Sequence, residues 1–126
     1  MKLFHGNAKH LAKENDFFRN VLFTTPNSQL VVMSIATRED IGYEVHAVDQ
    51  MFLIVKGDAE FEVEGESVFA GKYDVVIVPA GSTHNVRNVG GTPLKLVTVY
   101  SPPQHAEGTV HRTKDDALVA ESPATI

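Results

Sequence analysis

Residues 51–63 read MFLIVKGDAEFEV, two stretches of strand length joined by the turn Gly57-Asp58. In residues 59–63 apolar residues alternate with glutamates, which is typical of a strand with one buried and one solvated face. Residues 51–55 are apolar at every position, so we expect this strand to be covered on both faces, either by a second sheet or by a partner subunit. The second alternative is the basis on which we expect a homodimer.

Other short apolar stretches flank this hairpin and are separated by turn residues, chiefly glycine, proline and asparagine. The expected strands are Asn20–Thr24, Gln29–Ala36, Tyr43–His46, Met51–Lys56, Ala59–Val63, Ser67–Ala70, Asp74–Val78, His84–Asn88 and Leu94–Ser101. About nine short strands at this spacing predict an all-β sandwich or small barrel.

Helix is expected only near the two ends of the chain. One short helix is expected over Ala8–Glu14, and another over Ala117–Ala120 behind a capping box that begins at Thr113. The proline-containing stretch 101–113 is compatible with an ordered arm and with a flexible tail.

The composition of the 126 residues is that of a soluble globular protein, with 43% hydrophobic and 21% charged residues. Eleven basic against sixteen acidic side chains give a net charge of −5, which argues against nucleic acid or an anionic membrane as partner. The absence of cysteine excludes disulfides, thiolate ligands and a cysteine nucleophile. No stretch is apolar enough for a membrane span, and residues 1–16 lack a signal core, so we expect a cytoplasmic protein.

Two segments contain residue types that bind metals. If Tyr43–His46 is a strand, Glu44 and His46 point to the same face, and Gln50 opens the next strand nearby. A glycine-containing turn delivers His84 to the start of another strand. Such a set of nitrogen and oxygen donors suits a divalent manganese, iron, nickel, zinc or copper ion. The alternative is a pair of surface or hydrogen-bonded histidines beside a solvated glutamate.

At these residues the chain resembles the cupin superfamily of small β-barrels. The first cupin motif, a glycine followed by two histidines, a glutamate and a second glycine, corresponds to residues 42–57, with Glu44 at the first histidine and Gln50 at the glutamate. The second motif, a proline-x-glycine turn followed by a histidine and an asparagine, corresponds to residues 71–88.

The resemblance implies a double-stranded β-helix, or jelly-roll barrel, with short helical turns at its ends. It further implies a single domain over residues 1–126, with a barrel core over about 17–101 and a C-terminal arm over 102–126. It implies one divalent metal ion, and the ligands that correspond to the motifs are Glu44, His46, Gln50 and His84.

The resemblance also implies a class of activity, namely metal-dependent isomerase, lyase, hydrolase or dioxygenase chemistry on a small oxygenated or sugar-like molecule. Tyr43 and Asp49 are the local candidates for an acid, a base or a residue that orients the ligands. A non-catalytic small-ligand-binding or sensor cupin is the main alternative, and a metal-free structural dimer is the third.

Five further residues carry more open expectations. Tyr100 is either packed or brings its hydroxyl to the cavity, and His105 and His111 belong either to a solvated tail or to an arm that covers the barrel. Arg87 and Arg112 are candidates for binding an anionic group.

Overall fold

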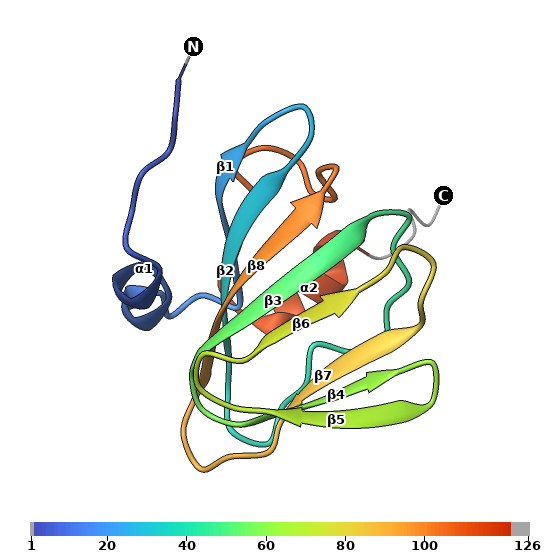
Figure 1. The fold of residues 1–126 in the computed structure, drawn as a ribbon. Helices are drawn as coiled ribbons and strands as arrows, with labels where there is room; N and C mark the ends of the chain where they lie inside the picture. The colour runs from blue at the N-terminus through green and yellow to red at the C-terminus, as the bar shows by residue number, and fades with distance from the viewer. Residues whose placement is uncertain (1, 122–126) are drawn as a thin grey trace.

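The computed structural model describes residues 2–121, and its strands form two antiparallel sheets (Figure 1). One sheet has the order β6-β3-β8-β2-β1-β9 and the other the order β5-β4-β7. The elements are α1 (Ala8–Glu14), β1 (Arg19–Thr24), β2 (Gln29–Ile35), β3 (Asp49–Lys56), β4 (Ala59–Val63), β5 (Glu66–Ala70), β6 (Val75–Val78), β7 (His84–Asn88), β8 (Leu94–Ser101), β9 (Val110–His111) and α2 (Lys114–Glu121). The sheets face each other across an apolar interior, which is the jelly-roll barrel expected from the sequence.

The interior is filled by alternate residues of the strands. Phe52 of β3 and Phe61 of β4 are fully buried, and their rings meet edge to face with centroids 5.0 Å apart. Ala59 is buried on the same face as Phe61, whereas Glu60 and Glu62 of β4 stay partly exposed. The alternation over residues 59–63 is therefore confirmed.

Strand β3 is covered on both faces, as its sequence predicts, but one cover is a helix. Phe52 and Ile54 point into the barrel, while Val55 packs on the other side with Ala12 of α1 and Val97 of β8. Helix α1 lies outside the six-stranded sheet (Figure 1). Because α1 covers the outer face, the apolar character of residues 51–55 no longer supports a homodimer.

The C-terminal arm is ordered over its described part. Its strand β9 pairs with β1, opposite Arg19, and was not predicted because two residues carry no periodic pattern. The buried side chain of Gln29 accepts hydrogen bonds from the backbone N–H groups of Gln104 and His105 and donates one to the carbonyl of His105 at 2.7 Å. Of the two alternatives for this segment, the ordered arm is correct.

Both predicted helices are present. Helix α1 has the predicted bounds, and α2 begins after Thr113, whose hydroxyl accepts a hydrogen bond from the N–H of Asp116 at 3.1 Å. No helix within residues 2–121 is long and apolar enough to cross a membrane.

One strand prediction is wrong. Residues 43–46 form no regular strand, and only Glu44 pairs, in an isolated bridge with His84. Gly42 precedes this bridge with a φ of +106°, a conformation that turns the chain and that only glycine adopts at little cost.

The burial pattern makes a prediction about stability. We expect Phe61→Ala to lower the free energy of unfolding by about 3–5 kcal/mol, because it empties a fully buried position in the core. Phe69→Ala, on the neighbouring strand β5 and 71% exposed, should change it by less than about 0.5 kcal/mol. Urea denaturation of both variants measures the difference, and equal losses would contradict this assignment of the core.

Candidate metal site

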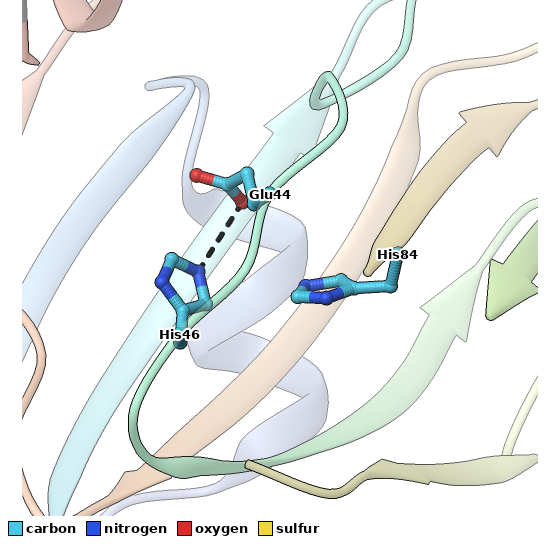
Figure 2. Close-up of side chains that lie close together, drawn as sticks. All are labelled: Glu44, His46 and His84. Carbon is cyan, nitrogen blue, oxygen red and sulfur yellow. Dashed lines mark ion pairs between the residues drawn. The ribbon is translucent and has the colours of Figure 1, made fainter. Parts of the chain in front are cut away.

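Three of the four predicted ligands meet inside the barrel. Glu44 and His46 lie between β2 and β3, and His84 is the first residue of β7. Each offers a ligand atom, and these atoms lie within 4.8 Å of one another. Figure 2 shows the three side chains converging from the two separate segments.

Backbone contacts hold the two segments in register. The N–H and C=O groups of Glu44 and His84 exchange hydrogen bonds of 2.9 and 3.0 Å, which places their side chains on the same face. The N–H of Gly81 donates to the carbonyl of His46 at 2.8 Å, and the carboxylate of Asp49 accepts from the N–H of Ala80 at 2.9 Å. Asp49, a catalytic candidate from the sequence, thus braces the turn that precedes His84.

The orientation of the two imidazoles leaves a nitrogen of each available. Nδ1 of His84 lies 3.0 Å from the carbonyl oxygen of Ser82, which can only accept, so Nδ1 carries the proton and Nε2 of the neutral ring has the lone pair. Nε2 of His84 and Nε2 of His46 are both buried and lack a hydrogen-bond partner among the described residues. The rings meet with centroids 5.5 Å apart.

Gln50, the fourth predicted ligand, also has a buried donor atom without a hydrogen-bond partner among the described residues. Its side-chain nitrogen donates to the hydroxyl of Thr98 at 3.0 Å, and Thr98 in turn donates to the carbonyl of Met51. This fixes the amide, and its oxygen Oε1 is left buried without a partner within residues 2–121. Gln50 lies directly across from Tyr100, and the Tyr100 ring packs on the His46 ring at 5.7 Å, so Gln50 faces the same interior.

Glu44 supplies the negative charge of the group. Its side chain is 18% exposed, and Oε1 lies 3.5 Å from Nε2 of His46, within ion-pair distance (Figure 2). Burial by itself raises the pKa of Glu44, but the interactions with His46 and the charge of Arg19 outweigh burial and lower that pKa below its usual value. The carboxylate is therefore ionised at neutral pH.

These donors fit a divalent cation. A buried polar atom without a partner costs about 1–3 kcal/mol, and three such atoms belong to Gln50, His46 and His84. One cation beside the Glu44 carboxylate would satisfy the nitrogens of His46 and His84, and Gln50 faces the same interior as a further donor. Two imidazoles, one carboxylate and one amide oxygen suit a metal of borderline hardness and leave coordination positions open.

Tyr43, the other catalytic candidate, lies outside this group. Its side chain is 57% exposed, and its hydroxyl bonds to the Glu62 carboxylate and accepts a hydrogen bond from Arg87 at 2.7 Å. Arg87 is thereby engaged on the surface, and Arg112 lies over the ring of Phe17. Neither arginine proposed for anion binding lines the cavity to which Glu44 and His46 contribute.

A cavity of about 570 Å³ opens beside the candidate ligands. Glu44 and His46 contribute to one side, and His105, His111 and Glu121 of the C-terminal arm contribute to the other. The arm interpretation of the two histidines is therefore correct. Sequence reasoning missed Glu121 and also Arg19, which lies behind the cavity wall, because only the unpredicted pairing of β9 with β1 brings the arm to Arg19.

Tyr100 and His105 link the two sides of the cavity. The Tyr100 ring contacts both His46 and His105 edge to face, and its hydroxyl lies 3.4 Å from Nε2 of His105. Burial raises the pKa of Tyr100, so its hydroxyl keeps its proton. Burial, together with the positive charge of Arg19, lowers the pKa of His105 to about 4, so this imidazole is neutral at physiological pH.

Comparison with known proteins agrees with the fold and the motifs. The sequence pattern of the cupin domain matches residues 31–100. The chain belongs to the cupin family. This cupin is 43% identical over 128 residues to the uncharacterized protein YrkC of Bacillus subtilis, a match that covers 95% of this chain and 68% of YrkC.

Solved structures extend the likeness to the arm. The cupin superposes on the crystal structure of BH2720 from Bacillus halodurans with a TM-score of 0.92 and 37% identity, over 94% of this chain and 95% of that one. It superposes on KdgF from Halomonas sp. with a TM-score of 0.64 and 22% identity, over 68% of this chain and 78% of KdgF. The second likeness shows the fold alone.

The lowered pKa of His105 predicts a loss of stability in acid. His105 takes up a proton near pH 6.5 in the unfolded chain but only near pH 4 in the folded metal-free protein. The free energy of unfolding therefore keeps its full value, as far as His105 is concerned, above pH 6.5 and decreases as the pH falls from 6.5 to 4. One proton limits the slope to about 1.4 kcal/mol per pH unit, and the partial exposure of the ring makes it smaller.

His105→Gln should flatten this part of the stability profile, measured by urea denaturation of the metal-free protein at several pH values. His10→Gln, a change at an exposed histidine of α1, is the matched control and should leave the slope unchanged. An unaltered slope in His105→Gln would show that other groups cause the acid sensitivity.

Proposed function

We propose that this cupin binds one divalent metal ion through Glu44, His46, Gln50 and His84 and acts as a metal-dependent enzyme on a small oxygenated molecule. The observation that carries the proposal is the set of unpartnered buried donor atoms on Gln50, His46 and His84 beside an ionised Glu44. Manganese, iron, nickel, zinc and copper all suit these donors.

The bound ion would act as a Lewis acid that polarises a substrate oxygen. The chain's own part is to orient the ligands and to enclose the substrate. Ser82 fixes the tautomer of His84 through its carbonyl, and Thr98 fixes the amide of Gln50. Neither Tyr43 nor Asp49 offers a free acid or base at the cavity, because both are engaged elsewhere.

His105 is a better candidate for moving a proton. It lines the same cavity as Glu44 and His46, and its neutral imidazole can accept a proton from a bound substrate. Its neighbour Tyr100 is a protonated hydroxyl within 3.4 Å of Nε2. A cupin that binds metal and ligand without turnover is the competing proposal, and an assay separates the two.

Metal analysis tests the ligand set. Purified protein incubated with each of the five metals and then desalted should retain one ion per chain, and a metal at 100 times its Kd should stabilise the fold by about 2.7 kcal/mol. His46→Ala and His84→Ala should each lose the ion and the stabilisation, because each removes a donor.

His10→Ala provides the matched control, since His10 is exposed on α1 and should leave both readouts unchanged. Circular dichroism of each variant establishes that it is folded. Stoichiometric metal in a folded His46→Ala, His84→Ala double variant would overturn the ligand set. Metal binding without turnover of sugar acids, hydroxy acids or diketones would favour the binding-module alternative.

A further inference from the structure

A buried arginine lies behind the arm side of the cavity. Arg19 of β1 is 1% exposed, and the charge of its guanidinium acts on Glu44, Tyr100 and His105. A cation this deeply buried is stabilised by an anionic partner, because its charge has lost the solvation that water would provide. Among the described residues, Arg19 forms one ion pair, with Glu121.

The Glu121 carboxylate makes a single contact with that guanidinium. Its Oε1 accepts one hydrogen bond of 3.0 Å from Nη1, and the same Nη1 lies 3.1 Å from Nδ1 of His111. Nε of Arg19 is buried and has no partner within the described residues. A guanidinium presents five donors, so the pair leaves Arg19 only partly satisfied.

The two residues of this ion pair, Arg19 and Glu121, differ in how easily they can move out of it. Arg19 is held in β1, whereas Glu121 is 39% exposed and belongs to the last described turn of α2, on the wall of the cavity. Because Arg19 is buried, only the Glu121 side of this ion pair can exchange with solvent. An anion that enters the cavity can therefore replace Glu121, while Arg19 cannot be left without an anion.

His111 lies beside the Arg19 guanidinium, and the contact between them fixes which ring nitrogen of His111 carries the proton. A guanidinium only donates, so Nδ1 of His111 must accept from Arg19 and the proton of the neutral ring lies on Nε2. Burial, with the charge of Arg19, lowers the pKa of His111, which agrees with a neutral ring. Ligand charge at this position is thus recognised by Arg19 and not by a protonated histidine.

We propose that Arg19 is the carboxylate-binding residue of this cupin and that Glu121 is an internal occupant which a ligand carboxylate displaces. The inference rests on the proposed metal site, because the other end of the ligand would reach the metal held beside Glu44. The ligand class is then a small organic acid with a carboxylate at one end and an oxygen donor at the other. The cavity of about 570 Å³ reaches both Glu44 and Glu121 and has room for such a molecule.

The charge balance favours an anion. With a divalent ion bound, the fixed charges are +2 from the ion, +1 from Arg19 and −2 from Glu44 and Glu121, which leaves +1. Displacement of Glu121 leaves +2 for the incoming carboxylate and any second acidic group. A neutral sugar would instead leave the ion pair between Arg19 and Glu121 in place.

The test is isothermal titration of the metal-loaded and the metal-free protein with malonate, succinate and glutarate, with 1,4-butanediol as the neutral match for succinate. Glu121→Gln should raise the affinity for at least one of the three acids by about three- to tenfold, because the tethered carboxylate no longer competes. Glu107→Gln, at an exposed residue of the arm outside the cavity lining, should leave the affinity unchanged, and the diol should not respond to either variant.

Arg19→Lys should lower the affinity for the same acid at least about tenfold. If Arg19→Lys fails to fold, the comparison of Glu121→Gln with Glu107→Gln still shows whether the Glu121 carboxylate competes with the acid. Acid affinities that are equal in the wild type and Glu121→Gln would overturn the proposal and leave the ion pair a structural contact. The metal-free titrations separate the two proposals, since a Glu121→Gln effect there supports the carboxylate site even if no variant of this chain retains metal.

Discussion

Two backbone hydrogen bonds, exchanged between Glu44 and His84, decide whether this molecule has a site at all. The two residues are forty positions apart in the sequence. Glu44 lies outside the regular strands, whereas His84 begins β7. This pair of hydrogen bonds sets the spacing of the two backbone segments and directs both side chains to the same face. This exchange therefore brings Glu44 and His84 side by side, in an arrangement where the donor atoms of Glu44, His46 and His84 lie within 4.8 Å of one another.

The structure around this bridge protects that geometry. The carbonyl of His46 accepts from Gly81, and the Asp49 carboxylate accepts from Ala80, so the turn before His84 is fastened from two sides. A site built on loops is ordinarily less precise than one built on strands. Here the loops are bonded to each other and to the first residue of β3, which gives them the rigidity that metal ligands need.

The local sequence pattern predicted most of the fold. At the cavity it predicted the metal-ligand side but missed Arg19 and Glu121. The bounds of β4, β7 and β8 follow from apolar alternation and turn residues, which are local properties. The convergence of Glu44, His46 and His84 was predicted for a partly wrong reason: period two in a strand over residues 43–46, where the structure has a single bridge. The motif spacing, not the strand, carried that prediction.

The remainder was inaccessible because it depends on contacts distant in sequence. Arg19 looks like an ordinary polar residue at the start of a strand, and nothing near it indicates a buried charge. Its burial follows from β9, a two-residue strand, and from Gln29, whose amide binds the backbone of residues 104 and 105. Helix α1 as the cover of β3 is another such contact.

The cavity accordingly has two sides with different origins. The side with Glu44 and His46 lies within residues 31–100, the part that matches the cupin domain, whereas Glu121 and Arg19 lie outside it. The likeness to KdgF covers 68% of this chain, and that to BH2720 covers 94%. In the proposed function, the donor set inside the shared barrel would define the metal chemistry, and the residues outside it would face the part of a ligand that extends beyond the metal. If Glu121 exchanges for a ligand carboxylate as proposed, selection among ligands depends on the first strand and the arm, where Arg19 and Glu121 form their ion pair.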